Sequence, residues 1–589
     1  MLNSTGEGRG NAVDTSDTYP RRERLMNQLH ARWVARTRPS TGFQSNPEPK
    51  MIGHFARGRQ LLAGNFLFSG HLIEAPGINL WEAAKRVTTS TNSVHGFAWL
   101  DDLAAVGDTK ARLTAQSWVS DWIVRYGHGR GAGWTPDITG QRLIRWVAHG
   151  CFLLRGADKD ASQAYFRSAA QQTIFLSRRW HIAPAGLPRF EALAGMIYAG
   201  LSLQGMENRV DLSIAALAHD CKIQIEPDGG IASRNPEELL EILTLLTWVE
   251  TALSGSGRAI PEAMLSGMAR MAPALRAMRH SDGGLARFHG GGRGLDGWLD
   301  QALAAVGTMQ QPDQCSHMGY FRLAAGRTSV ISDTLAPPVF AAAAKAHAST
   351  LAFELTSGRR PLIVSCGSGS SFGPEWRRAG RATPSHSTLC IEGVSSALIE
   401  LGKDGAELLC YGPESVQSEF TALGDSYRLE MAHDSYRATH GLTHVRTLEL
   451  SNHGRALAGE DLLTILEEVD KQTFDKALDS ENLQGIQWSV RFHLHPEVEP
   501  IIDLGGAAIS LTQKSGEIWV FRHDGVGEMR LDPSVYLENG RLRPRATQQV
   551  VLSGRAMSYA TRIRWSLSKA QDTPTALRDV KENQHELDV

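Results

Sequence analysis

The chain has 589 residues, of which 42% are hydrophobic and 21% are charged, and its 61 Lys and Arg nearly balance its 63 Asp and Glu. This composition is typical of a globular protein and excludes a disordered chain, and the length predicts two large domains or three smaller ones. The net charge is −2 and the sequence contains no basic block, which argues against a protein whose main function is to bind nucleic acid. The overall charge does not exclude a local basic cleft that binds an acidic sugar.

The N-terminal residues and the cysteines bear on the cell compartment. Residues 1–20 are rich in Gly, Ser, Thr, Asn and Asp, so we expect a disordered lead-in without the basic and apolar regions of a secretory signal. No run of about 18 apolar residues occurs, which argues against a membrane span. The six cysteines are scattered without a CxxC pair and predict buried thiols in a reducing compartment. We therefore expect a cytoplasmic protein, with the periplasm as the alternative, and the sequence does not indicate the oligomeric state.

The first element in chain order is a helix over residues 21–38. An apolar face recurs there at helical spacing, formed by Leu25, Leu29, Trp33 and Val34. The stretch from residue 53 to residue 96 is rich in Gly and aromatic residues, and we expect it to be irregular or extended.

Helical periodicity then repeats between residues 137 and 271. Each segment has an apolar face and ends at Gly, Pro or polar residues. Several helices in series without strands between them predict packed helix pairs, which form an incomplete α/α toroid over residues 21–318. The segments read GQRLIRWVAHGCFLL, LPRFEALAGMIYAGLSLQG, NPEELLEILTLLTWVETAL and AMLSGMARMAPALRAM.

The pattern changes near Gly319 to short alternating or β-branched runs separated by Gly, Asn, Asp or Ser. Many such strands in sequence predict an antiparallel β-sandwich over residues 319–569, and residues 570–589 form a charged tail. The fold class is therefore α+β with several domains: an N-terminal α/α toroid followed by a C-terminal antiparallel β-sandwich. The order of elements argues against a doubly wound sheet, which needs strands and helices in alternation.

Four strings in the second half carry a family resemblance. In chain order they are AHASTLAFELTSGRRPLIVSCG, RATPSHSTLCIEG, HVRTLELSNHGRALAGEDLL and RFHLHP. Together they resemble the C-terminal motifs of the heparinase II/III family of polysaccharide lyases, over roughly residues 320–525. The helical half is similar more loosely, through GWTPDITGQRLIRWV and DGGIASRNPEELLE.

The resemblance implies cleavage of a uronic-acid polysaccharide or oligosaccharide by β-elimination. A base removes the proton at C5, donors stabilise the enolate-like charge, and the leaving oxygen at C4 receives a proton. Members of the family use an Asn, a Tyr and a His for these steps. Here Lys345 stands at the position of the catalytic His and Glu238 at that of the Tyr. The catalytic candidates implied by the motifs are His347, His386, Asn235, Glu238 and Lys345.

The resemblance also implies residues that bind the substrate or a metal. Arg234 and Arg381 are candidates for binding a carboxylate, His289 for a sugar contact and Trp134 for stacking on a sugar ring. The metal ligands of some relatives fall on His347, Ser365 and His386, where Ser365 replaces an Asp. Two imidazoles are fewer than the three or four protein ligands that zinc prefers, so zinc or another divalent metal stays an open alternative.

Each candidate also has a structural interpretation. His347 and His386 can fix two strands by hydrogen bonds, and the segment from Arg234 to Glu238 can simply begin a helix, because Pro and Glu suit the first turn. The Gly-rich stretch at residues 279–294 lacks the flanking strand and helix of a nucleotide-binding loop. A lyase acting on an acidic glycan is therefore the leading hypothesis. The alternative is a catalytically impaired glycan-binding or scaffolding protein, and a hydrolase using Glu237 or Glu238 is a third.

Overall fold

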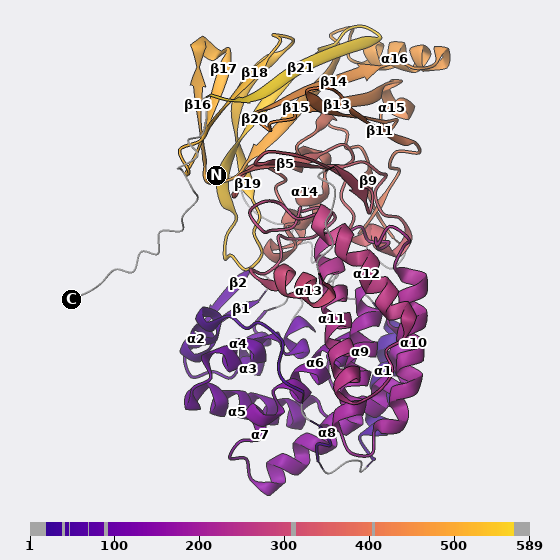
Figure 1. Ribbon diagram of the computed structural model, residues 1–589, viewed down its shortest axis with the longest axis vertical. Helices are drawn as coiled ribbons and strands as arrows, with labels where there is room; N and C mark the ends of the chain where they lie inside the picture. The colour runs from indigo at the N-terminus through magenta and orange to yellow at the C-terminus, as the bar shows by residue number, and fades with distance from the viewer. Residues whose placement is uncertain are drawn as a thin grey trace, which may run out of the picture. The chain divides into compact units, whose positions relative to one another are not determined.

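The structure is a computed structural model that describes residues 19–37, 42–45, 47–68, 70–87, 92–307, 314–402 and 407–570. The expected lead-in and charged tail lie almost entirely outside these residues. The chain forms two compact units, which are described separately (Figure 1). The first unit comprises Met1–Leu217, Trp248–Ala259 and Glu400–Leu408, and the second comprises Ala218–Thr247, Ile260–Ile399 and Leu409–Val589.

The first unit is mainly helical, as the periodicity predicts. The stretch expected to be irregular between residues 53 and 96 contains a hairpin of β1 (Asn65–Phe68) and β2 (His71–Glu74), but also helices α2 and α3. The helices are α1 (Arg21–Val34), α2 (Phe55–Ala63), α3 (Leu80–Ala84), α4 (Ala98–Val106), α5 (Thr109–Tyr126), α6 (Pro136–Ala148), α7 (Gly150–Leu154), α8 (Lys159–Arg179) and α9 (Leu187–Ser202), with the start of α10 (Val210–Gln224) and the end of α11 (Pro236–Gly255).

Of the four residues of the predicted apolar face of α1, only Val34 is buried. Asn27, Ala31 and Val34 are buried, whereas Leu25 and Trp33 are 57% and 47% exposed. The periodicity correctly predicts a helix, but the side that packs on the unit is formed by small and polar residues. Among the described residues, none of the helices combines the length and the hydrophobicity that crossing a bilayer requires.

Helices α6 and α9 approach each other at a pair of glycines. A Cβ atom on Gly195 would come closer than 3.0 Å to the backbone of Gly140, and one on Gly140 would come equally close to the backbone of Glu191. Real Cβ atoms essentially never show such distances, and here the obstacle is backbone, which cannot rotate away. The crossing of these two helices therefore depends on the absence of side chains at both positions.

We predict that Gly195→Ala lowers the free energy of unfolding of the first unit by about 1–3 kcal/mol, because overpacking forces the two helices apart. Urea unfolding followed by circular dichroism measures the change. The matched control is Gly255→Ala near the end of α11, where a Cβ would meet no atom within 4 Å. That control should be neutral or slightly stabilising, since Ala favours helix over Gly. Equal effects of the two substitutions would contradict the close approach.

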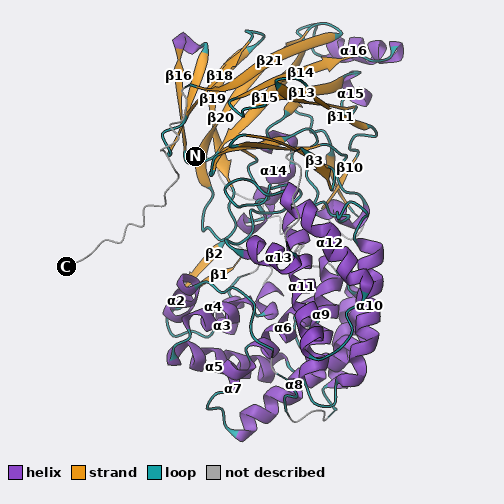
Figure 2. Ribbon diagram, in the orientation of Figure 1, coloured by secondary structure: helices purple, strands orange, loops and turns teal. Residues whose placement is uncertain are grey.

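The second unit contains helices and two antiparallel sheets (Figure 2). Its helices are the end of α10, the start of α11, α12 (Glu262–Ala277), α13 (Trp298–Val306), α14 (Pro374–Arg381), α15 (Arg437–His440) and α16 (Glu468–Ser480). The compact unit therefore begins well before the change from helix to strand, which falls at Cys315. A small pair of strands, β9 (Leu398–Leu401) and β10 (Glu407–Cys410), lies outside both large sheets.

The described residues of the second unit form one sheet of nine strands and one of eight. In the first, the order β19-β20-β15-β7-β6-β5-β4-β3 is joined by β8, which pairs with β15; in the second, the order is β11-β12-β13-β14-β21-β18-β17-β16. The bounds are β3 (Cys315–His317), β4 (Tyr320–Ala325), β5 (Thr328–Asp333), β6 (Phe353–Ser357), β7 (Arg360–Val364), β8 (Leu389–Ile391), β11 (Val416–Ala422), β12 (Ser426–His433), β13 (Thr443–Ser451), β14 (Ala456–Thr464), β15 (Ile486–Leu494), β16 (Val498–Asp503), β17 (Ala508–Gln513), β18 (Ile518–His523), β19 (Glu528–Tyr536), β20 (Arg545–Ala556) and β21 (Ala560–Lys569).

A single apolar core joins the two sheets and confirms the predicted sandwich. Phe353 from one sheet stacks on Trp565 from the other at a ring distance of 5.7 Å, and Phe492 lies 4.7 Å from the same indole ring. A buried polar group lies beside this core. Its centre is Asp461, which accepts hydrogen bonds from Arg446, His444 and the Trp565 indole. These charges are paired where they are buried, so the core stays free of isolated charge.

Candidate functional site

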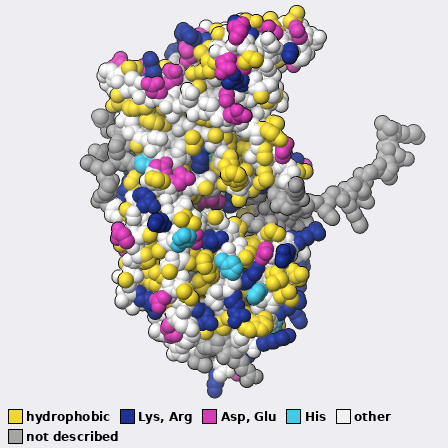
Figure 3. Space-filling model, turned by 90° about the vertical axis from the view of Figure 1, so that its right-hand side faces the viewer, with side chains coloured by type: hydrophobic (Ala, Val, Ile, Leu, Met, Phe, Trp, Pro, Cys, Tyr) yellow, Lys and Arg dark blue, Asp and Glu magenta, His cyan; other side chains and the backbone are white. Residues whose placement is uncertain are grey.

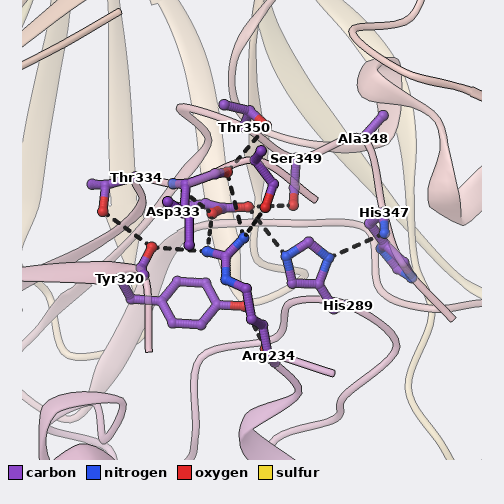
Figure 4. Close-up of polar contacts among 12 residues, drawn as sticks. Arg234, His289, Tyr320, Asp333, Thr334, His347, Ala348, Ser349 and Thr350 are labelled. Atoms are coloured by element: carbon purple, nitrogen blue, oxygen red, sulfur yellow. Dashed lines mark hydrogen bonds and ion pairs between the residues drawn. The ribbon is translucent and has the colours of Figure 1, made fainter. Parts of the chain in front are cut away.

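The motifs of the second unit converge on a buried ion pair between Arg234 and Asp333 (Figure 4). Arg234 lies just before α11, and Asp333 is the last residue of β5. The guanidinium donates to Asp333 Oδ1 at 2.5 Å and to the backbone carbonyls of Met318, Gly319 and Ala336 at 2.8–3.1 Å. All three guanidinium nitrogens are thereby occupied by groups of the protein.

The surroundings of the pair hold the carboxylate in its charged form. Burial opposes the charge of Asp333, but the Arg234 guanidinium, His289 and Ser349 together keep the pKa of this carboxyl well below its usual range. Ser349 donates its hydroxyl to Asp333 Oδ2 at 2.7 Å, and the His289 Nε2 atom lies 3.5 Å from the same oxygen. Tyr320 lies under the guanidinium and donates its hydroxyl to the Arg234 carbonyl oxygen at 2.6 Å. The pair is therefore fixed from several sides.

The backbone around the ion pair is strained. Four residues other than glycine adopt left-handed conformations there: Arg234 (φ 50°), His289 (φ 44°), Met318 (φ 53°) and Leu351 (φ 62°). A side chain in this region costs of order 1 kcal/mol or more, so the surrounding contacts must over-determine it. Leu351 shows how this happens, since its N–H donates to the Asp333 carbonyl oxygen at 2.8 Å.

Three histidines form a chain that leads away from the ion pair. The backbone N–H of His347 donates to His289 Nδ1 at 3.1 Å, and His347 Nδ1 lies 3.3 Å from His386 Nε2. His386 Nδ1 in turn faces the Ser365 hydroxyl at 3.2 Å. Burial, together with neighbouring imidazoles, lowers the pKa of His386 to about 3 and that of His347 well below its usual range. All three side chains are at most 2% exposed, so they are neutral and dry at physiological pH.

The exposed part of the site is a different ion pair. Lys345 Nζ donates to Glu238 Oε1 at 2.6 Å, with the lysine side chain 64% and the glutamate side chain 13% exposed. Glu238 is held in the first turn of α11, where Asn235 Oδ1 caps the helix by accepting the backbone N–H groups of Glu237 and Glu238. Glu237 accepts the Gly292 N–H at 2.7 Å, and burial raises the pKa of its carboxyl. Asn235 thus serves the helix end.

Comparisons with known proteins agree with this architecture. The family model described as heparinase II/III-like, C-terminal, matches residues 310–566. Residues 310–566 therefore form a heparinase II/III-like C-terminal domain. The fold of the chain superimposes on a crystal structure of heparinase III with a TM-score of 0.68 and 13% identity, covering 95% of this chain and 92% of that one. A mutant of the heparan sulfate lyase HepC from Pedobacter heparinus gives a TM-score of 0.56 and 14% identity, covering 92% and 88%.

A relative by sequence spans both units of the chain. FtsZ-localized protein C from Caulobacter vibrioides is 29% identical over 571 residues, which covers 93% of this chain and 94% of the relative. The structural neighbours share much less sequence, so they establish the fold and not the reaction.

The described residues do not support the metal site that the sequence left open as an alternative. Among the described residues, no group of three or more His, Cys, Asp and Glu side chains could hold a metal ion. His347 and His386 face each other, the Ser365 hydroxyl is already hydrogen-bonded to His386, and His289 Nδ1 accepts a backbone N–H. Zinc needs three or four protein ligands that converge on one point, and these residues do not fit that requirement.

The four substrate-binding candidates, Arg234, Arg381, Trp134 and His289, are all buried. Arg381 is 1% exposed and donates to the carbonyl oxygens of Ala343 and Ala346, each at 2.8 Å. Trp134 lies in the first unit, is 2% exposed and donates its indole N–H to the Tyr126 carbonyl oxygen. With Arg234 and His289 also buried, these placements favour the structural interpretation of all four residues. The structure brings Asn235, Glu238 and Lys345 together: Asn235 is 4% exposed, whereas the Lys345 side chain is 64% exposed.

Sequence reasoning missed Asp333, Tyr320 and Ser349, the partners that organise the site. The only signal for Asp333 is a single acidic residue at the end of a buried β-branched strand, TSVISD. Its partner Arg234 lies 99 residues earlier, a separation at which a single sequence gives no pairing information.

We predict that Asp333→Asn lowers the free energy of unfolding of the second unit by about 3–5 kcal/mol at pH 7, because it leaves a buried guanidinium unpaired. The loss should shrink as the pH falls below about 4. A carboxyl with a depressed pKa stabilises the folded state only above its ordinary pKa, and this stabilisation fades toward its folded pKa. Urea unfolding at pH 7 and at low pH measures both effects.

The control for that substitution is Ser349→Ala, which removes one hydrogen bond to the same carboxylate and should cost only about 1 kcal/mol. Replacing both charges, as in Arg234→Met with Asp333→Leu, should destabilise the protein less than Asp333→Asn alone. A deficit that stays constant down to pH 2 would contradict the proposed electrostatic origin.

Proposed function

We propose that this chain uses the polysaccharide-lyase fold as a scaffolding or glycan-binding protein that does not carry out β-elimination. The observation that carries this proposal is the ion pair between Lys345 and Glu238. The sequence motifs align these two residues with the family's catalytic His and Tyr. An ion pair holds lysine in its ammonium form, which has no lone pair with which to accept the C5 proton. A glutamate is normally a carboxylate at pH 7, and a carboxylate has no proton to give to the leaving oxygen.

The buried histidines support the same proposal. A general base must come within hydrogen-bonding reach of the proton that it removes. His347 and His386 are 2% and 0% exposed, and each imidazole is engaged with a protein neighbour. A sugar could reach them only after the surrounding strands had moved.

The sequence relative supports a role in an assembly. FtsZ-localized protein C covers nearly the whole chain, so both units are shared and not the sandwich alone. Its name places it with FtsZ, and we propose the same association for this chain. A fold that binds a polymer can keep its surface while losing its chemistry, since function resides in sites carried by folds.

The second candidate is a lyase acting on an acidic glycan, which the likeness to heparinase III favours. In this case Lys345 would neutralise the uronate carboxylate, with Asn235 and Glu238 beside it and with His347 or His386 moving the proton. This alternative requires the ion pair between Lys345 and Glu238 to open when substrate binds.

We predict no formation of unsaturated uronate when the purified full chain is incubated with heparan sulfate, chondroitin sulfate or their oligosaccharides. Near-ultraviolet absorbance of the double bond measures the product, with an active lyase as the positive control. Direct binding of the same glycans, measured by calorimetry, separates a glycan-binding protein from a scaffold without glycan affinity. A rising absorbance that disappears in Lys345→Ala would contradict the proposal and identify the site.

The association with FtsZ has its own test. We expect the full chain to sediment together with FtsZ polymers and to stay in the supernatant without them. Lys345→Ala serves as the matched control and should sediment equally well, because a scaffold does not need the residual site. A chain that does not sediment with FtsZ polymers at any concentration below about 100 μM would contradict the association. Its dissociation constant would then exceed about 100 μM, which corresponds to a binding free energy weaker than about −5.5 kcal/mol.

A further inference from the structure

Helix α1 presents an apolar surface to solvent. Leu25, Met26, Leu29 and Trp33 are 57%, 37%, 46% and 47% exposed. Exposed hydrophobic side chains also lie elsewhere on the surface, as the space-filling view shows (Figure 3), so exposure alone does not single out this helix. Its distinction is that four large apolar side chains share one face over three turns.

The same face is basic. Arg21, Arg22 and Arg32 are exposed. At about 100° per residue the four apolar residues occupy an arc of about 100°, and Arg22 falls within it while Arg32 and Arg21 lie about 20° and 40° beyond its edge. The only acidic residue of the helix, Glu23, lies on the other side and pairs with Arg179 of α8. The face therefore combines arginines with Leu, Met and Trp and carries no acidic residue of α1.

The packing of α1 holds this face outward. Asn27 Oδ1 accepts a hydrogen bond from the Arg179 Nε–H at 2.7 Å, and Ala31 and Val34 are buried on the same side of α1. The guanidinium of Arg178, also from α8, lies 3.8 Å above the Trp33 ring and adds a further positive charge. The polar and small side of α1 is fixed to the unit, so the apolar side cannot rotate inward.

We propose that α1 binds the surface of an anionic phospholipid bilayer and lies in the interface as a peripheral amphipathic helix. Leu, Met and Trp side chains enter the boundary between headgroups and acyl chains, and arginines pair with anionic headgroups. The face of α1 carries arginines and no acidic residue. This uniform positive charge matches an anionic lipid surface better than a peptide partner, because a peptide usually carries charges of both signs. This inference concerns a surface outside the site and does not rest on the proposed function.

The test is flotation of the full chain with two kinds of vesicle. One contains phosphatidylglycerol and phosphatidylcholine in equal parts, and the other contains phosphatidylcholine alone. We expect binding to the first and not to the second, with a decrease as salt is added. The double variant Leu25→Asp, Leu29→Asp should abolish binding, and the triple variant Arg21→Gln, Arg22→Gln, Arg32→Gln should weaken it roughly tenfold to a hundredfold.

The control is Leu212→Asp in α10, an apolar residue of the same unit that is 77% exposed but lies outside the face. It should bind vesicles as the wild type does. Circular dichroism confirms that all variants keep the helical signal, which is expected because the substituted side chains are exposed. A wild-type chain that stays unbound at low salt would overturn the proposal and leave the face to a protein partner. Retained binding by the Leu25 and Leu29 double variant would overturn the assignment to α1.

Discussion

The second unit depends on the ion pair between Arg234 and Asp333. Arg234 belongs to the helical segment before α11, and Asp333 ends a strand of the larger sheet. One guanidinium thus joins the two kinds of secondary structure, and it does so in a dry environment where a lone charge would be prohibitive. The boundary between the compact units therefore does not coincide with the change from helix to strand. The helical residues 218–247 belong to the same unit as the sandwich. The strained conformations of Arg234, His289 and Leu351 surround the same point.

The pair also determines what the neighbouring residues can do. Because Arg234 already serves Asp333 and three backbone carbonyls, its positive charge stabilises the fold and is not presented to a ligand. The histidine chain continues this closed arrangement as far as Ser365, whereas the Lys345 side chain is 64% exposed to solvent. Arg234 and the three histidines therefore contribute to the packing of the second unit through hydrogen bonds with one another's neighbours.

Much of the architecture could be predicted from the sequence, because periods of 3.6 and 2 residues report helices and strands directly. The outward face of α1 could not be predicted, since an apolar stripe shows which residues lie together and not what they contact. Arg234 and Trp134 illustrate a second limit: both are chemically suited to sugars, but burial decides their use, and burial arises from distant segments. The motifs named both Lys345 and Glu238, and the structure places these two side chains in contact as an ion pair.

The chain of histidines has a consequence for where protons reside. Since the His347 amide donates to His289 Nδ1, the proton of the neutral His289 ring must sit on Nε2, on the side of Asp333. The imidazole is thereby locked in one tautomer, and its dipole points permanently at the carboxylate. With 0% exposure, this proton cannot exchange with water while the unit is closed. Its rate of isotope exchange would therefore report how often the second unit opens, and not the acidity of the ring.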